Sequence, residues 1–419
     1  MSLPFSKIRS FVLIFSLVLL SLGIGYQYGL RNSKAYAPSS NASLTGTASP
    51  STIDFGLFWD VWGRLNRDFI DAKNIDVKKM LYGAINGMVA SLDDPYTSFL
   101  PPKENKDFKE DIGGAFEGIG AQLGLKESRV MVIAPLKGNP AEKAGIRAGD
   151  FILKVNDEDT AGWSVQQAVT KIRGKRGTEV TLNIFHEGAR EPVDITITRA
   201  TIEVPSVESW IKSPSEMTEI SKFPDAVRMN GKVAYLRLTR FGDRTDEEWN
   251  KAVRDIASAL RNGTKGVIFD LRNNPGGYLE GAVYIGSEFI SSGVVVTQTN
   301  SNGSKMDYPV NRTGTLLSAP IVVLVNKGSA SAAEIVAGAL RDYKRATIVG
   351  ETTFGKGSVQ TPEELRDGSS LHVTTGKWLL PKGDWIHKKG IKPDIEVKWD
   401  GLEATGDAQL AKAVELLLK

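Results

Sequence analysis

Three short apolar runs constrain the fold of the C-terminal half of this 419-residue chain more than any other feature. They occupy residues 266–272, 320–326 and 346–350, and the first two lead into helical patterns that begin near Leu279 and Ser331. Short continuous apolar runs bounded by turn residues are typical of strands buried on both faces. Alternating strands and helices therefore predict an α/β layered domain, with its functional residues at the ends of strands.

A further strand is predicted over residues 233–241, ahead of this alternation. Thr245 then has Glu248 three residues on, a spacing typical of a capping box at the start of a helix. The apolar side chains that recur at helical spacing behind it are Ala252, Ile256 and Leu260. We place the start of the layered domain near residue 200, where the character of the chain changes.

Two dense motifs, residues 326–335 and 353–360, contain Ser331 and Lys356. A serine nucleophile needs a base, and none of the histidines lies in a motif typical of a triad partner: His186, His372 and His387. A lysine serves as the base only when its neutral form is accessible, which burial beside apolar side chains achieves. The motifs therefore indicate a Ser/Lys hydrolase, and we interpret His372 and His387 as structural or surface residues.

Several neighbours suit this chemistry. Ser331 begins a helix, whose free N–H groups favour developing negative charge, and Gly276 with Gly277 offers a second set of N–H groups. Gln360 is placed to orient the lysine amine. Asp342, near the end of the same helix, has two interpretations: it pairs with neighbouring basic side chains, or it supports the active site.

Residues 113–199 form a module of short alternating strands and two helical patterns. The residues that we expect to line a peptide site come from a glycine-rich turn and from one face of the second helix: Gly118, Ile119, Gly120, Val165 and Val169. Backbone N–H groups in such a turn can face a carboxylate, and the strand edge beside it can take an added peptide strand. The module resembles a PDZ domain, which implies recognition of a free protein C-terminus.

The N-terminus reads as a targeting segment. Residues 11–24 are apolar apart from serines and a glycine, and the basic Lys7 and Arg9 precede them. Extension to residue 30 gives about 20 residues, the length that a bilayer needs. We predict an uncleaved single-pass anchor in the cell membrane over residues 1–30, with the bulk of the chain on the extracytoplasmic side. A cleaved signal peptide is the alternative.

Residues 31–54 are predicted to be a flexible linker, because Ser, Thr, Ala, Gly and Pro dominate them. Residues 55–112 are predicted to be helical. Two sets of apolar side chains recur there at helical spacing: Phe58, Val61, Trp62, Leu65 and Phe69, then Met80, Ile85, Met88 and Val89. The second helix should end at residues 93–95, Asp-Asp-Pro. These helices are interpreted either as ordinary core helices or as a surface for homo-oligomer formation.

Composition excludes some classes of function. The net charge is +3, and the basic residues that precede the first acid account for it: Lys7, Arg9, Arg31 and Lys34. The rest of the chain is close to neutral, so no nucleic-acid partner is expected. The chain has no cysteine, which excludes a disulfide framework and a thiolate metal site. We expect neither a cofactor nor a metal ion.

Motifs spread over residues 55–419 resemble those of the C-terminal processing peptidases, the tail-specific proteases of the S41 serine peptidase family. They stand here as DLRNNPGG, NKGSASAAEI, AGALRDYKRA, GETTFGKGSVQ and KGIKPD. The resemblance implies that Ser331 is the nucleophile, Lys356 the general base and Gln360 the partner of the lysine.

The resemblance also implies an oxyanion hole made by the N–H of Gly276 or Gly277 together with that of Ala332. The implied fold is an α/β multidomain protein with the membrane anchor, the helical N-terminal region, the PDZ domain and a crotonase-like protease core of ββα layers over residues 200–419. The implied activity is cleavage of cell-envelope proteins near their C-termini. In related proteases the PDZ domain can also gate the active site, and Arg199, at the exit strand into the core, is a candidate coupling contact.

Two other classes of protein share parts of this pattern. A catalytically silent peptide-binding scaffold would use the PDZ-like module alone, and the intact set of Ser331, Lys356 and Gln360 argues against it. A crotonase-type acyl-thioester enzyme would share the core fold, but it has no use for a PDZ-like module or a membrane anchor.

Overall fold

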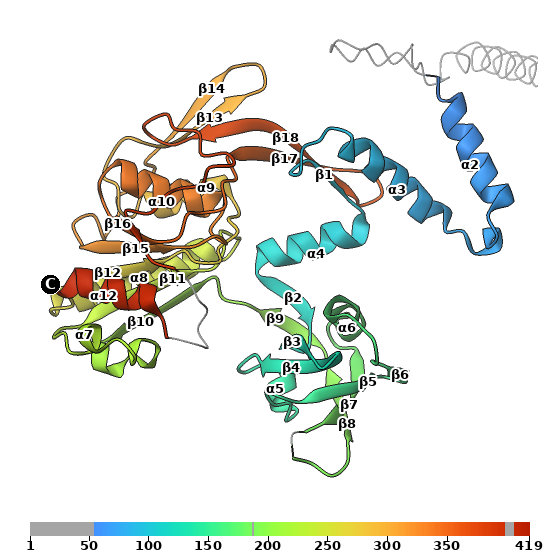
Figure 1. Cartoon of the computed structure of the whole chain (residues 1–419), viewed down its shortest axis with the longest axis horizontal. Helices are drawn as coiled ribbons and strands as arrows, with labels where there is room; N and C mark the ends of the chain where they lie inside the picture. The colour runs from blue at the N-terminus through green and yellow to red at the C-terminus, as the bar shows by residue number, and fades with distance from the viewer. Residues whose placement is uncertain (1–53, 187, 399–405) are drawn as a thin grey trace, which may run out of the picture. The chain divides into compact units, whose positions relative to one another are not determined.

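The computed structural model describes residues 54–186, 188–398 and 406–419 (Figure 1). The chain divides into two compact units, residues 1–77 and 78–419. The predicted anchor and nearly all of the predicted linker lie outside the described residues. Within the described residues, no helix combines the length and the apolar character that crossing a membrane requires.

The first unit contains α2 (Gly56–Asp68) and the 3-10 helix η2 (Ala72–Asn74). The rings of Phe58, Trp59 and Trp62 contact one another on α2, with centroids 5.0 to 6.2 Å apart. The helix predicted here is confirmed. The interpretation of α2 as an ordinary core helix is wrong for the part of the chain that the structure describes, because none of its residues is buried there.

The helix α3 (Val77–Ala90) buries only Val89, and it ends before the Asp-Asp-Pro sequence, as predicted. A turn over residues 91–97 leads into β1 (Ser98–Leu100), which α4 (Pro102–Gly113) follows. Gly114 ends α4 in the left-handed conformation, with φ of 69°, which a glycine adopts without steric cost.

The PDZ-like module is a sheet in the order β3-β4-β5-β7-β8, with β6 on β5. Its elements are β3 (Ala121–Lys126), β4 (Arg129–Pro135), α5 (Pro140–Lys143), β5 (Phe151–Val155), β6 (Glu158–Asp159), α6 (Val165–Ile172), β7 (Glu179–Phe185) and β8 (Val193–Thr198). They match the predicted strands and helices closely. Their apolar sides enclose a core of their own that includes Val130, Val132, Ile152, Leu182 and Ile184. The strand β3 is an edge strand.

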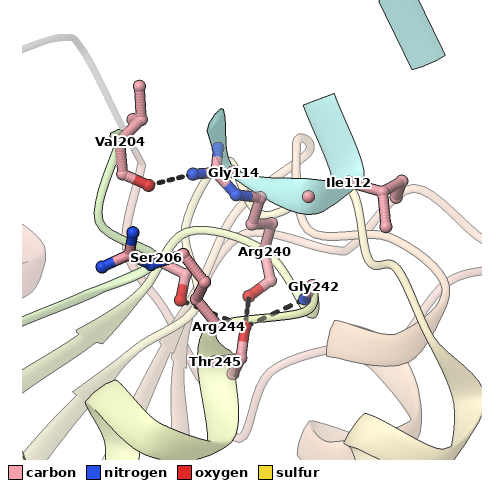
Figure 2. A pocket seen from close by; sticks show the side chains of 9 residues that line it. Ile112, Gly114, Val204, Ser206, Arg240, Gly242, Arg244 and Thr245 are labelled. Atoms are coloured by element: carbon pink, nitrogen blue, oxygen red, sulfur yellow. Dashed lines mark hydrogen bonds between the residues drawn. The ribbon is translucent and has the colours of Figure 1, made fainter. Parts of the chain in front are cut away.

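A two-stranded sheet of β2 (Ala115–Gly118) and β9 (Ala200–Glu203) connects this module to the rest of the unit. Next to it, a small pocket is lined by residues of three segments (Figure 2). Arg240 donates to the carbonyl of Val204 there, and Thr245 Oγ1 accepts a hydrogen bond of 2.9 Å from the N–H of Gly242 (Figure 2).

The predicted capping box at Thr245 is wrong. The helix α8 (Thr245–Arg261) begins as expected, but the Glu248 carboxylate accepts hydrogen bonds of 2.6 and 3.1 Å from the N–H groups of Ser206 and Val207. Sequence spacing alone could not reveal this, because the competing donors lie about 40 residues upstream.

The main sheet of the C-terminal domain has the order β10-β11-β12-β15-β16-β19. Its strands are β10 (Val207–Lys212), β11 (Val233–Leu238), β12 (Val267–Asp270), β15 (Ile321–Val325), β16 (Thr347–Gly350) and β19 (Ile395–Glu396). All pairs except β10–β11 are parallel. The three apolar runs of the sequence are therefore central parallel strands, as predicted.

Helices cover both faces of this sheet. The helices α8, α9 (Leu279–Gly286) and α10 (Ala332–Asp342) pack on one face, against side chains such as Phe269 and Val323. On the other face, α7 (Pro224–Val227), the 3-10 helix η4 (Thr218–Ile220) and α12 (Ala408–Leu418) pack against the alternate side chains of the same strands.

A second sheet lies on the far side of α9 and α10 (Figure 1). Its order is β1-β18-β13-β14, with β17 also paired to β18. The strands not yet given are β13 (Val294–Asn300), β14 (Lys305–Pro309), β17 (Ser358–Glu364) and β18 (Ser370–Leu379). The strand β1 thus places a segment from before the PDZ-like module inside the sheet of the C-terminal domain.

Candidate active site

Ser331 lies at the junction between β15 and α10, where a parallel strand ends and a helix begins. Its backbone has φ of 55° and ψ of −117°, a combination that a serine rarely adopts. Strain of this kind persists only where surrounding contacts impose it, and it is concentrated at functional sites. The conformation supports the prediction that Ser331 has a chemical role.

The glycine turn of residues 273–277 lies against Ser331. A Cβ on Gly276 would come within 2.7 Å of the Ser331 Cβ and 3.0 Å of the Ala332 nitrogen. The N–H of Gly276 donates to Asn274 Oδ1 at 2.9 Å, so it is already occupied. The N–H groups of Gly277 and Ala332 donate to no acceptor in the described part of the chain. Of the predicted oxyanion donors, these two are free in this conformation.

Arg272 fixes the start of this turn. It is buried, and it forms ion pairs with Asp270 at 2.5 Å and with Asp407 at 2.9 Å. Asp407 is also the N-cap of α12, where its carboxylate accepts a hydrogen bond from the N–H of Leu410. The C-terminal helix and the glycine turn are therefore held by one guanidinium group.

Glu334 connects the loop that contains Ser331 with the loop that contains Lys356. Its fully buried carboxylate accepts hydrogen bonds from the N–H of Ser331 at 2.8 Å, of Gly355 at 2.7 Å and of Lys356 at 2.9 Å, and from the Thr353 hydroxyl. Burial raises the pKa of Glu334, and these four donors oppose that rise. One side chain therefore fixes the backbone of the serine and of the lysine.

Lys356 lies two residues before the start of β17, and Gln360 lies on that strand. Burial lowers the pKa of Lys356, and the negative charge of Asp94 opposes this. A lowered lysine pKa makes the neutral amine accessible at a lower pH, which is what a general base requires. This is the environment that the sequence predicted for the lysine.

Among the described residues, the predicted catalytic side chains form no hydrogen bonds with one another. Gln360 Nε2 donates to Ser358 Oγ at 3.0 Å and to Thr374 Oγ1 at 3.1 Å. Among the described residues, Ser331 Oγ and Lys356 Nζ do not share a hydrogen bond. Catalytic hydrogen bonds often form only in the substrate complex, so this separation is compatible with the predicted roles.

The predicted tail-binding residues lie around β3. Gly118 is the last residue of β2, Ile119 and Gly120 connect it to this edge strand, and Gly120 has φ of 76°. Val165 and Val169 are half-buried on α6, which packs next to β3. An edge strand beside a helix is the arrangement that a peptide joins by β-strand addition.

The sequence comparisons agree with these two parts of the chain. The family model described as peptidase family S41 matches residues 232–397, and that of the PDZ domain matches residues 107–185. The carboxy-terminal processing protease CtpA of Bacillus subtilis (strain 168) is 40% identical over 361 residues, which cover 85% of this chain and 72% of the relative.

The chain belongs to the carboxy-terminal processing proteases of peptidase family S41.

CtpB of the same Bacillus subtilis strain is 36% identical over 346 residues, covering 82% of this chain and 68% of the relative. Among solved structures, the photosystem II D1 C-terminal processing protease matches with a TM-score of 0.50 and 30% identity, covering 87% of this chain and 97% of that chain. The protein is therefore a serine-type peptidase with a PDZ domain.

Two residues singled out in this protease lie away from the serine. Asp342 is at the opposite end of α10, where it pairs with Arg341 at 3.0 Å and accepts a hydrogen bond from the N–H of Lys382. These contacts agree with the first interpretation of Asp342, in which it pairs with a neighbouring basic side chain. Arg199 donates to the carbonyls of Lys171 and Ile172, so it caps the C-terminus of the PDZ helix α6.

Sequence reasoning missed several residues around the lysine of this protease. Asp94 was interpreted only as part of the end of a helix, Tyr96 was not singled out, and Glu334 was interpreted only as part of a motif. His372 and His387 both lie near Lys356: the charge of Lys356 contributes, after burial, to lowering the pKa of His372, and the His387 ring stacks on Trp385 next to the lysine loop. The Glu334 spacing, three residues after the serine, was the one local signal available.

Proposed function

We propose that Ser331 is the nucleophile and Lys356 the general base of a carboxy-terminal processing protease. The observation that supports this most strongly is the Glu334 carboxylate, which fixes the backbone of both residues at once. The neutral Lys356 amine takes the proton of the Ser331 hydroxyl as the oxygen attacks the peptide carbonyl carbon. The N–H groups of Gly277 and Ala332 would stabilise the oxyanion.

The lysine ammonium then gives its proton to the leaving amine, and an acyl-enzyme remains on Ser331. Water, deprotonated by the neutral lysine, releases the new C-terminus and restores the serine. Gln360 would turn from Ser358 and Thr374 to accept a hydrogen bond from the Lys356 amine and hold it toward the serine. The half-buried site favours this chemistry, because burial favours the neutral amine.

The proposed substrates are cell-envelope proteins with a free C-terminus. The tail would add to the edge of β3, with its carboxylate at the turn of Gly118, Ile119 and Gly120 and its side chains toward Val165 and Val169. The membrane anchor over residues 1–30 and the extracytoplasmic location remain proposals from the sequence. Gating by the PDZ domain, with Arg199 as the coupling contact, is a proposal of the same kind.

The aromatic cluster of α2 supports a homo-oligomer. This helix exposes Leu57, Trp59, Val61 and Leu65 to different extents, and no residue of the described part of the chain buries any of its side chains. Exposed apolar surface of this density marks interaction sites in soluble domains. The proposed partner is α2 of a second copy.

One digestion experiment tests this function. A peptide with a free C-terminal carboxylate and its amidated form are each incubated with wild-type protein and with Ser331→Ala. Cleavage of the free peptide by wild type alone supports a serine peptidase that reads tails. Equal cleavage by Ser331→Ala contradicts the proposed nucleophile. Thioester turnover in its place would favour the crotonase-type alternative, and binding without cleavage would favour the silent scaffold.

A further inference from the structure

The turn of residues 94–97, between α3 and β1, lies beside the catalytic lysine although it precedes the PDZ domain in the sequence. It is held there by β1, which pairs with β18 in the register Ser98↔His372 and Leu100↔Ser370. Backbone pairing of this kind fixes the position of the turn relative to the hairpin of β17 and β18. That hairpin also contains Gln360.

Tyr96 covers the lysine. The Lys356 Nζ atom is 5.3 Å from the centroid of the Tyr96 ring. The rings of Tyr96 and His387 meet edge to face, with their centroids 5.8 Å apart. A ring in this position attracts an ammonium group weakly and excludes water from it. Exclusion of water penalises the charged amine, which is the larger influence on a half-buried lysine.

Asp94 acts on the same amine in the opposite sense. Its carboxylate accepts hydrogen bonds from the Thr97 hydroxyl at 2.7 Å and from the N–H of Tyr96 at 3.2 Å, which hold it in place. Its negative charge favours the charged form of Lys356. Two neighbours on one turn thus oppose each other at the proposed base.

Thr97 extends the contact to Gln360. Its hydroxyl oxygen accepts a hydrogen bond of 3.1 Å from the N–H of Thr374, and Thr374 Oγ1 accepts one of 3.1 Å from Gln360 Nε2. A chain of hydrogen bonds therefore runs from Asp94 through Thr97 and Thr374 to the proposed partner of the lysine.

We propose that residues 94–97 are a working part of the active site, in which the Tyr96 ring covers Lys356 and the Asp94 carboxylate fixes the turn that carries this ring, so that both act as positioning residues for the lysine. The inference rests on the proposed role of Lys356 as general base. The other titratable groups that face the lysine come from different elements: His372 on β18, His387 after β18, and Glu334 on α10. Those groups are unchanged in the variants below.

The test compares the pH dependence of kcat/KM in two variants. Tyr96→Ala admits water to the ammonium, so the acid limb of the profile moves to higher pH. Asp94→Asn removes the charge that favours the ammonium, so the acid limb moves to lower pH. We expect opposite shifts of about half a pH unit or more. Tyr96→Phe, which keeps the ring, should shift the profile less than Tyr96→Ala does. Asp93→Asn, which changes an exposed neighbouring carboxylate, is the control and should leave the profile unchanged.

A second measurement does not depend on turnover. Each substitution is placed in the Ser331→Ala protein, and the reactivity of Lys356 toward trace acetic anhydride is followed against pH by mass spectrometry. Opposite shifts in this titration support the inference. No shift in either titration or rate profile overturns it while leaving the Ser/Lys assignment standing. Shifts in the amine titration without shifts in the rate profile overturn the base assignment instead, and with it the catalytic role of the turn.

Discussion

The carboxylate of Glu334 accepts a hydrogen bond of 2.9 Å from the backbone N–H of Lys356, 22 residues further along the chain. The same oxygen accepts a hydrogen bond of 2.8 Å from the N–H of Ser331. The loops that contain Ser331 and Lys356 thus depend on one carboxylate that is itself fully buried. Removing that charge would leave several buried N–H donors without an acceptor, which is costly in a protein interior.

Glu334→Gln tests this arrangement. The amide replaces one acceptor oxygen with a donor that faces backbone N–H groups, so we expect kcat/KM to fall about 100-fold or more and the free energy of unfolding to fall by about 2 kcal/mol. Glu363→Gln, an exposed position on β17, is the matched control and should match wild type. Peptide cleavage and urea unfolding measure the two effects. Unchanged cleavage by Glu334→Gln would show that the serine and lysine loops hold their places without it.

Lys356→Met tests the environment of the lysine through stability. Because burial lowers the pKa of Lys356 below its ordinary value of 10.5, the unfolded chain binds more protons than the folded one between the two pKa values. The stability of wild type relative to Lys356→Met should therefore rise with pH across that window. We expect the variant to be the more stable protein near pH 7 and the difference to shrink toward pH 10.5. Urea unfolding over this pH range measures it, and a gap independent of pH would contradict a lowered pKa.

Much of the fold was predictable because its signals are local. The parallel strands β12, β15 and β16 are continuous apolar runs. In the PDZ module, turn residues or helix-start residues separate nearly every strand from the next element. The candidate site was predictable where its residues share a motif, as Ser331 with Ala332 and Lys356 with Gln360 do. The proposed PDZ groove residues come from signals of the same local kind, a glycine turn and the apolar spacing of a helix.

The remaining parts of the site depend on contacts that sequence spacing does not encode. Thr97 and Thr374 are 277 residues apart and meet only because β1 joins the second sheet. Glu248 forms hydrogen bonds with Ser206 and Val207 in place of the predicted cap, because the N–H groups at the start of β10 lie within its reach. The occupied N–H of Gly276 likewise follows from the position of the Asn274 side chain.

Val169→Glu tests tail recognition by the PDZ domain. A carboxylate on the half-buried face of α6 would repel the terminal residues of a bound tail, so we expect KM for a free-carboxylate peptide to rise about tenfold or more with a smaller change in kcat. Gln166→Glu adds the same charge on the exposed face of the same helix and is the control. An equal rise of KM in both variants would mean that the added charge, and not its position in the groove where the tail binds, explains the effect. That outcome would contradict tail recognition at Val169.

Deletion of residues 1–37 tests the proposed anchor. The truncated protein should be recovered in the soluble fraction with kcat/KM close to that of full-length protein, since the proposed linker separates the anchor from the folded units. Full-length protein should fractionate with membranes. Recovery of a mature form that starts near residue 38 would show that the N-terminus is a cleaved signal peptide.

The most direct test of the Ser/Lys assignment is the kcat/KM of Ser331→Ala, Lys356→Ala and the double variant on one peptide with a free C-terminus. A nucleophile and its base act as a unit, so each single substitution should reduce kcat/KM by roughly 10⁴-fold or more and the double variant should lose little beyond that. Lys356→Arg should be equally inactive, because a guanidinium group stays protonated. Circular dichroism should show the same fold in all four proteins. A Lys356→Ala enzyme that keeps a substantial part of the wild-type kcat/KM would contradict the account.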